Sequence, residues 1–397
     1  MAYVIVGASL AGVNAAETLR AEGFTGEIVM VGDEPEPPYE RPPLSKGFLL
    51  GNQALEEAFV QPAEWYQSNE ISLYLSTSAT SLDVEAKRLT LSSGKYLDYE
   101  KLLLATGARP RPIDLPGARY LRVMRDSQEL KELLTPGRHV VVIGAGWIGL
   151  EVAAAGRSHG AQVTVVELDR LPLRRVLGEE LAEFYRDVHV EHGVEFHFGR
   201  SATTADDKSV TLDDGTVIPA DVILAGVGVI PNVELAQEAG LTVDSGVVVS
   251  ESLETSAKDV FACGDVASWW HPLAGTHIRV EHWENARQSG QAAARAMLGQ
   301  QVSYDWIPYF YSDQYDVGME YSGWVGPDGY DTVVDRGDRR AKEFIAFWVK
   351  DGRVLAGMNV NVWDVQDPVR ELIRACYQGK TVDLARLADP DTPLDRL

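Results

Sequence analysis

The stretch VVVIGAGWIGLEVAAA, Val140–Ala155, places three glycines in the order G-x-G-x-x-G between two apolar runs. The β-branched run before the glycines predicts a strand buried on both faces, and the run after them predicts a helix. In such a unit Gly144 makes a tight turn, Gly146 lets the main chain approach a pyrophosphate, and Gly149 lets helix and strand pack closely. The phosphate charge then lies at the helix N-terminus. The stretch therefore predicts a dinucleotide-binding α/β unit.

A second unit of the same kind begins the chain, in YVIVGASLAGVNAAETL, Tyr3–Leu19. Gly7 and Gly12 hold the outer glycine positions, and Ser9 stands at the middle one, where its small side chain is a mild departure. One such match is weak evidence, but two, each between a predicted strand and a predicted helix, are strong. Glycine turns that serve only ordinary α/β packing are the less favoured alternative. We therefore expect two cofactors that react with each other, FAD and a nicotinamide.

Each unit also carries an acidic residue after its second predicted strand, Asp33 in VMVGDE and Glu167 in VTVVELD. A carboxylate at this point binds ribose hydroxyls and repels a 2′-phosphate. Glu167 therefore favours NADH over NADPH, although Arg170, Arg174 and Arg175 lie close by in sequence and leave this preference open.

The composition is that of an ordinary globular protein of two or three domains, with 397 residues, 45% of them hydrophobic and 24% charged. The net charge of −23 argues against non-specific binding of nucleic acid. Two distant cysteines, Cys263 and Cys376, form neither a disulfide framework nor a metal-ligand spacing, which favours a cytoplasmic location. The N-terminus lacks a charged leading region, and no run of 18 apolar residues predicts a membrane span.

The segments that follow the two α/β units also resemble each other. Hairpins are predicted at Ser93–Gly94 and at Asp214–Gly215, and each is followed by a buried strand, KLLLATG and DVILAGVG. The proline-rich segment ARPRPIDLPG, residues 108–117, is typical of a domain boundary. From about Asp305 strands alternate with turns, including a hairpin at Asp351–Gly352, which predicts a further α+β domain.

The motifs GASLAG, PPYERPPLSK, LLLATGARPRP, GAGWIGLE, ACGD and YSDQYD, in this order, resemble those of the FAD-dependent ferredoxin reductases that serve monooxygenases and dioxygenases. The resemblance covers nearly the whole chain. It implies an α/β fold of the glutathione-reductase type, with two Rossmann-like domains and a C-terminal α+β domain. The FAD-binding domain would comprise residues 1–108 and 227–304, the NADH-binding domain residues 109–226, and the C-terminal domain residues 305–397.

The resemblance also implies site residues. The FAD contacts would be Gly7, Ser9, Ala11, Gly12, Asp33, Arg41, Lys46, Ala79, Arg122, Asp265 and Trp283. The NADH contacts would be Gly144, Gly146, Ile148, Gly149, Glu151, Glu167, Arg175 and Gly228.

Thiol-dependent relatives carry a reactive cysteine beside the flavin, whereas this chain has Ser45 and Lys46 in the comparable segment and no cysteine before Cys263. Chemistry that needs a thiol therefore lacks its essential atom, and electrons would leave the flavin singly. Lys46 is the strongest candidate for a catalytic residue, because an ammonium group stabilises the negative charge that develops on a reduced flavin ring. The resemblance offers Glu151 as its counter-charge. A solvated lysine and a helix-dipole carboxylate are the plainer alternatives.

Two features of the site are left as hypotheses. The prolines of Pro37–Gly51 stiffen the segment that holds Arg41 and Lys46. Tyr309 and Tyr311 stand where some relatives carry tryptophan, and either contact the flavin or pack in the core.

The natural electron acceptor is a 2Fe–2S ferredoxin, an acidic protein, with no role for nucleic acid or membrane. Docking it on an acidic enzyme requires a local basic face. The candidates are Arg336, Arg339, Arg340 and Lys342, and the group Arg170, Arg174 and Arg175. An NADH:rubredoxin, an NADH:quinone and a monodehydroascorbate-type reductase remain alternatives on the same fold. A flavoprotein that acts through interaction alone would require a targeting segment and a basic nucleic-acid surface, and we expect neither from this sequence.

Overall fold

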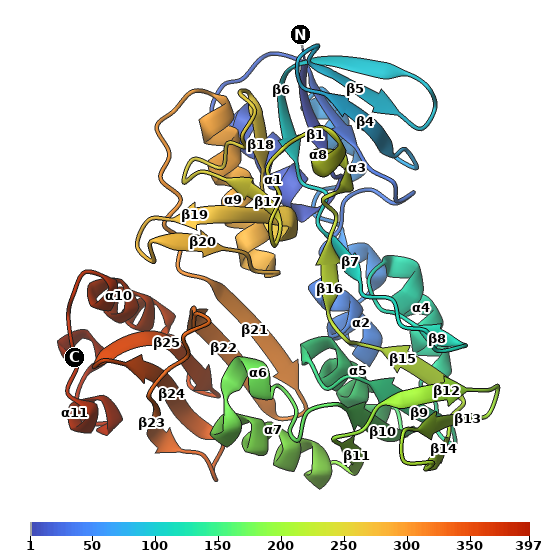
Figure 1. Ribbon diagram of the computed structural model, residues 1–397, viewed down its shortest axis with the longest axis vertical. Helices are drawn as coiled ribbons and strands as arrows, with labels where there is room; N and C mark the ends of the chain where they lie inside the picture. The colour runs from blue at the N-terminus through green and yellow to red at the C-terminus, as the bar shows by residue number, and fades with distance from the viewer. Residues whose placement is uncertain (1) are drawn as a thin grey trace.

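The computed structural model describes residues 2–397. Figure 1 shows two α/β units, one above the other, and a C-terminal sheet that lies beside the lower unit. The upper unit is built from both the beginning of the chain and the segment around α9. Residues far apart in sequence therefore pack together in one α/β unit.

The first α/β unit is centred on a parallel sheet. Its strands follow the order β3 (Ile71–Tyr74), β2 (Ile28–Val31), β1 (Ala2–Val6), β6 (Tyr96–Leu104) and β18 (Val260–Ala262). The antiparallel strands β5 (Arg88–Leu91) and β4 (Ala79–Asp83) extend β6, which confirms the hairpin at Ser93–Gly94. All five residues of β1 are buried, as expected for a strand covered on both faces.

Two helices of this unit pack unusually closely. α1 (Leu10–Ala21) follows the first glycine loop, and α9 (Trp283–Met297) comes from the later segment. A Cβ atom at Gly290 would lie 2.3 Å from the carbonyl oxygen of Ala11, so only glycine fits at this crossing. The close contact joins the two parts of the chain into one body.

The second α/β unit repeats the first. Its parallel sheet has the order β11 (Val194–Phe198), β10 (Gln162–Glu167), β9 (His139–Ile143), β15 (Val222–Ala225) and β8 (Ala118–Arg119). An antiparallel sheet of β12 (Ala202–Ala205), β13 (Ser209–Leu212) and β14 (Val217–Pro219) confirms the hairpin at Asp214–Gly215. Its longer helices are α4 (Met124–Leu133), α5 (Trp147–Ser158) and α7 (Glu179–Glu191).

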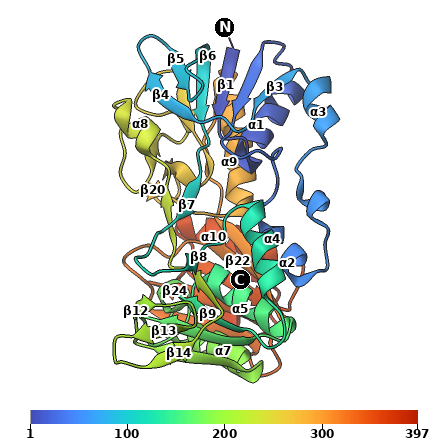
Figure 2. The same cartoon turned by 90° about the vertical axis from the view of Figure 1, so that its right-hand side faces the viewer.

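The chain passes between the two units twice, side by side. β7 (Ala108–Pro110) pairs antiparallel with β16 (Val229–Pro231), and Figures 1 and 2 show these strands between the upper and lower parts. Asn232 donates to the carbonyl of Thr106 at 2.7 Å, and Thr106 donates to that of Asn232 at 2.8 Å. The domain bounds expected at residues 108 and 227 fall at this connection and stay a prediction.

The C-terminal sheet is entirely antiparallel. Its order is β21 (Tyr309–Gln314), β22 (Val317–Gly323), β25 (Arg353–Val360), β24 (Glu343–Lys350) and β23 (Thr332–Asp338), with α10 (Gln366–Tyr377) packed on it. The hairpin at Asp351–Gly352 is confirmed. The remaining elements are short: α2 (Gly47–Leu50), α3 (Ala63–Ser68), α6 (Arg174–Leu177), α8 (Glu234–Glu238), α11 (Leu384–Ala388), β17 (Val247–Val249), β19 (Ala267–His271) and β20 (Thr276–Ile278).

The C-terminal sheet shares one hydrophobic core with the second α/β unit. Trp348 of β24 is fully buried and donates its indole N–H to the carbonyl of Leu177 at 3.0 Å. Phe344 of the same strand packs edge to face with Phe184 of α7. This continuous apolar contact fixes the C-terminal sheet on the second unit.

The structure corrects the expectation of a basic docking face at residues 336–342. Arg336 is only 9% exposed, and its guanidinium donates to the carbonyls of Asp389 and Pro390 in the C-terminal tail. Arg339 pairs with Asp335 at 2.7 Å, and Lys342 pairs with Asp316 at 3.0 Å. Of these four residues, Arg336 is therefore a structural group, and the charges of Arg339 and Lys342 are neutralised locally.

This role of Arg336 predicts a local effect on stability. Replacing Arg336 with methionine keeps the aliphatic stem but removes the charged donors, each worth about 1.5–3 kcal/mol. We expect R336M to speed amide hydrogen exchange in residues 383–397 at least tenfold, as measured by mass spectrometry. The exposed Arg340 provides the matched control R340M, which should exchange like the wild type. Equal exchange in the tail of both variants would contradict the assignment.

Candidate functional site

The first glycine loop leaves an open helix N-terminus. A Cβ at Gly7 would lie 2.1 Å from the carbonyl oxygen of Ala105, and one at Gly12 would lie 2.2 Å from that of Gly7. Ser9 stands at the N-cap of α1 without a side-chain capping bond. The loop is thus compressed against β6 and the helix, while the first-turn amides of α1 are available for an anion.

A cluster of charges surrounds this helix start. Arg41 pairs with Glu34 at 2.6 Å and donates to the carbonyl of Arg122 at 2.5 Å. Arg122 in turn pairs with Asp265 at 3.1 Å. The Nε of Arg122 is buried and has no hydrogen-bond partner among residues 2–397.

Two further features connect this cluster with the loop. Gly264 next to Asp265 lies against Ala11, since a Cβ at Gly264 would be 3.2 Å from that of Ala11. Burial lowers the pKa of the Arg122 guanidinium, a cost that an anion beside it would offset. Arginines beside an open helix N-terminus suit the pyrophosphate of FAD, so these residues fit the expected cofactor.

Asp33 and Ala79 lie in segments that adjoin strands β2 and β4 of the first unit. Asp33 follows β2 and is exposed, and Ala79 begins β4. Main-chain bonds from Thr77 to Gly32 at 2.8 Å and from Ser76 to Glu34 at 3.0 Å bring the two segments together. This is the arrangement expected of residues that hold an adenosine.

Lys46 and Glu151 form a buried ion pair. The Lys46 ammonium lies 2.8 Å from Oε1 of Glu151, whose side chain is 2% exposed. Glu151 also accepts hydrogen bonds from the hydroxyls of Ser45 at 2.5 Å and Ser312 at 2.6 Å. The predicted contact between Lys46 and Glu151 is therefore present. A solvated lysine and a simple helix-dipole role for the glutamate do not describe these surroundings.

Aromatic side chains line the other side of Lys46. Its ammonium lies 5.2 Å from the ring centroid of Tyr311, and Trp283 at the start of α9 meets Tyr311 edge to face at 6.3 Å. Tyr309 instead donates to Glu320 at 2.7 Å and lies under Arg370. Of the two tyrosines, Tyr311 is the one that contacts Lys46.

The second glycine loop repeats the compression of the first. A Cβ at Gly144 would lie 2.6 Å from the carbonyl oxygen of Gly226, and one at Gly149 would lie 2.2 Å from that of Gly144. Gly146 caps α5, and Ile148 in the first turn is 43% exposed. The amides of the first turn of α5 are thus available to a ligand, and their contact with NADH stays a prediction.

Glu167 lies at the end of β10 beside this loop. Its carboxylate accepts from the amide of Ala145 at 2.6 Å and from that of Asp169 at 2.8 Å. Gly228 has a φ of 97° with no neighbour that a Cβ would meet. The carboxylate is therefore held in place by two main-chain amides beside the second glycine loop.

A cleft of about 820 Å³ runs between α6 and the loop after β22. Phe310 on its wall packs against Trp147 of the second glycine loop, with ring centroids 5.3 Å apart. His282 also lines it. Burial lowers the pKa of His282 to about 3, and its buried Nδ1 has no partner within residues 2–397. Of the expected NADH contacts, Arg175 lines this cleft.

Arginines lie at one end of this cleft. Arg175 is 85% exposed on its side chain and only 3.8 Å from Asp169, whereas Arg174 pairs with Asp169 at 2.6 Å. Arg170 pairs with Glu179. Of the second proposed basic group, only Arg175 is weakly paired, so this group does not form a continuous basic face.

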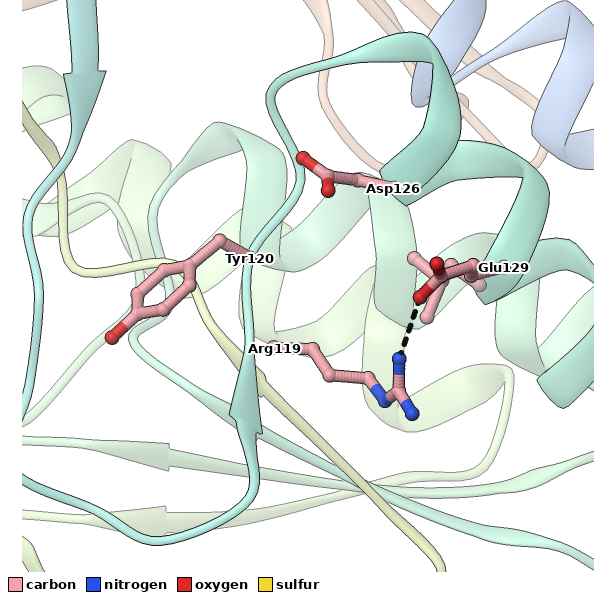
Figure 3. A pocket seen from close by; sticks show the side chains of 5 residues that line it. Arg119, Tyr120, Asp126 and Glu129 are labelled. Atoms are coloured by element: carbon pink, nitrogen blue, oxygen red, sulfur yellow. Dashed lines mark hydrogen bonds and ion pairs between the residues drawn. The ribbon is translucent and has the colours of Figure 1, made fainter.

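A smaller pocket of about 220 Å³ lies by α4 (Figure 3). Arg119 pairs with Glu129 at 3.0 Å, and Asp126 accepts from the amides of Arg122 and Val123. These polar groups satisfy one another, and the pocket lies apart from both glycine loops.

The sequence did not identify Ser312 or His282 as site residues. Ser312 lies within the run YSDQYD, in which the tyrosine was the candidate residue. Its position next to Tyr311 gave no signal, because neighbouring residues of a strand face opposite sides. His282 gave no signal, since only the fold places it against Phe310.

Comparisons with known proteins agree with this geometry. The family model described as pyridine nucleotide-disulphide oxidoreductase matches residues 1–290, and a model described as reductase C-terminal matches residues 309–397. The chain is 41% identical to the ferredoxin–NAD(+) reductase component of the anthranilate 1,2-dioxygenase system of Burkholderia cepacia, over 99% of this chain and 98% of that protein. It is 37% identical to putidaredoxin reductase of Pseudomonas putida, over 90% and 88% of the two chains.

Solved structures show the same similarity. The reductase in a covalent putidaredoxin reductase–putidaredoxin complex superimposes with a TM-score of 0.93 at 34% identity, over 99% of this chain and 97% of that chain. A ferredoxin reductase from Rhodopseudomonas palustris gives 0.94 at 36% identity, over 100% and 99%. The two paired units, the additional C-terminal sheet and these matches lead to one conclusion: the chain belongs to the pyridine nucleotide-disulphide oxidoreductase family, among its ferredoxin–NAD(+) reductases.

Proposed function

We propose that this protein oxidises NADH and passes the electrons through FAD to a 2Fe–2S ferredoxin that serves an oxygenase. The observation that carries the proposal is the buried Lys46–Glu151 pair at the meeting point of the two glycine-loop units. The relatives named above are ferredoxin reductases of such systems. Among residues 2–397, no helix has the length and apolar character needed to cross a membrane.

No thiol takes part in the proposed reaction. Cys263 and Cys376 are buried and unpaired with each other. Burial raises the pKa of both thiols, most strongly that of Cys263, which keeps them protonated and unreactive. The same two buried cysteines support the prediction of a cytoplasmic location.

Bound FAD would accept a hydride from NADH and release the electrons singly. The chain supplies position and charge. Arg122 and the open start of α1 would hold the pyrophosphate, while Gly146 and Glu167 would hold NADH. Lys46 would place a positive charge and hydrogen-bond donors where negative charge develops, and Glu151 keeps that ammonium in a fixed place.

An acceptor assay tests the proposed function. The purified protein is reduced anaerobically with NADH and then mixed with a 2Fe–2S ferredoxin, a rubredoxin or a quinone. We expect the ferredoxin to be reduced fastest at equal concentration. Faster reduction of rubredoxin or quinone would support the alternatives left open by the sequence instead.

Removal of the Lys46 ammonium should slow hydride uptake. We expect K46M and K46A to reduce flavin about 100-fold more slowly with NADH, the usual effect of removing one preorganised donor. FAD content should stay near that of the wild type, because the pyrophosphate contacts remain. The rate is measured by stopped-flow absorbance.

K131M is the matched control for this change. The Lys131 ammonium lies 4.2 Å from the ring of Phe48, close to the same segment but outside the ion pair. Its reduction rate should be that of the wild type. A wild-type rate in K46M would remove Lys46 from the reaction.

Replacement of Glu167 should change the choice of nicotinamide. The carboxylate would repel a 2′-phosphate, so E167S should lower the ratio of kcat/KM for NADH to that for NADPH at least tenfold. E195Q on the neighbouring strand β11 serves as the control and should keep the wild-type ratio. An unchanged ratio in E167S would show that other groups set the preference.

A further inference from the structure

A line of buried polar side chains leads away from Glu151 into the C-terminal sheet. Ser312 donates to Glu151 at 2.6 Å, Gln314 lies 3.1 Å from Ser312, and the ring Nε2 of His189 lies 2.7 Å from the amide oxygen of Gln314. Ser312, Gln314 and His189 are each no more than 2% exposed. The line thus joins α5, β21 and α7, and three consecutive contacts lie out of reach of water.

The direction of each hydrogen bond follows from the carboxylate. The oxygens of Glu151 accept from Ser45 and pair with Lys46, and the hydroxyl of Ser312 likewise donates to the carboxylate. The Ser312 oxygen then accepts from the amide N–H of Gln314, which turns the amide oxygen of Gln314 toward His189. Because that oxygen is an acceptor only, the Nε2 of His189 must carry a proton. Every donor in the line therefore points toward Glu151.

The surroundings of His189 agree with this direction. Burial lowers its pKa to about 4, so the ring is neutral near pH 7 and carries a single N–H. Its other nitrogen, Nδ1, lies 3.4 Å from the hydroxyl of Tyr315, which is able to donate to it. The neutral ring with the proton on Nε2 satisfies both neighbours.

The line ends on the oxygen that also holds Lys46. Oε1 of Glu151 accepts from Ser312 and pairs with Lys46, while Oε2 accepts from Ser45. A change at Ser312 therefore changes the orientation of the carboxylate to which the ammonium is bound. Hydrogen bonds to charged groups contribute more free energy than those between neutral groups, and they fix the relative orientation of the two groups more strictly.

We propose that His189, through Gln314 and Ser312, is a positioning residue that orients Glu151 and thereby Lys46 for hydride uptake. The proposal rests on the proposed function, because it concerns the rate of a step at the Lys46–Glu151 pair. It assigns the second α/β unit and the C-terminal sheet a joint part in the active site. His189 touches neither Lys46 nor the predicted nucleotides, so its effect passes through the intervening side chains.

Three variants separate positioning from simple packing. H189F keeps the ring volume and removes the donor. H189Q restores an N–H near the position of Nε2. H192F is the matched control, because His192 stacks on Tyr315 with ring centroids 3.7 Å apart but lies outside the line. Melting temperature and FAD content are measured for all three, so that a folding defect is recognised.

The expected result is a change in rate without a change in binding. H189F should slow flavin reduction by NADH about tenfold, within the range of coupling between residues of one hydrogen-bond network, and leave the Kd for NADH unchanged. H189Q should recover most of the rate, and H192F should stay within about twofold of the wild type. A wild-type rate in H189F, or equal slowing in H189F and H192F, would overturn the proposal.

A double-mutant cycle tests the route. S312A removes the donor to Glu151, so any effect of His189 that passes through Ser312 is already lost in it. The double variant S312A/H189F should therefore reduce flavin no more slowly than S312A alone. If the rate reductions of S312A and H189F instead multiply in the double variant, His189 acts by a route that does not include Ser312, and the proposal is overturned.

A measurement without turnover completes the test. In the oxidised, FAD-loaded protein at pH 7, ¹⁵N NMR of the histidine rings should show His189 neutral with its proton on Nε2, and H189F identifies the signal. A proton on Nδ1, or a charged ring, would overturn the proposal. Failure of the wild type to accept electrons from NADH would instead reject the proposed function. The tautomer of His189 would still show in which direction the hydrogen bonds between His189 and Glu151 run.

Discussion

The constraint on which the arrangement depends is the burial of one negative charge. Glu151 is almost completely removed from water, and an isolated carboxylate in such a place would cost several kcal/mol. Its ammonium and hydroxyl partners come from the segment after β2 and from β21, while Glu151 itself is on α5. The charge is therefore satisfied only when the segment before α2, strand β21 of the C-terminal sheet and helix α5 of the second α/β unit are all in place.

Two kinds of contact hold those parts at the required distance. The paired strands β7 and β16 form a short, double connection between the α/β units, fastened by Thr106 and Asn232. The C-terminal sheet is attached by a continuous apolar core that includes Trp348. An ordinary flexible linker would not hold the Lys46 ammonium within hydrogen-bond distance of the Glu151 carboxylate, because ion pairs require precise geometry.

Much of the site was predictable because its residues belong to local patterns. The glycine loops, the acids after the second strands and the segment around Lys46 are each defined within some thirty residues or fewer, where turn geometry and strand periodicity act directly. The basic docking face was wrong at Arg336 for the converse reason. A run of charges in a sequence does not reveal that its guanidinium reaches a tail some fifty residues later.

The sequence by itself determined the duplicated α/β units, the two nucleotides they are suited to bind and the absence of a cysteine ahead of Lys46. These follow from short-range spacing and from residue identity. Only the tertiary structure decided that Ser312 bonds to Glu151, that Tyr311 rather than Tyr309 lies by Lys46, and that His189 connects to the same carboxylate. Such contacts join residues more than 100 positions apart, and their partners are chosen by the packing of whole sheets and helices.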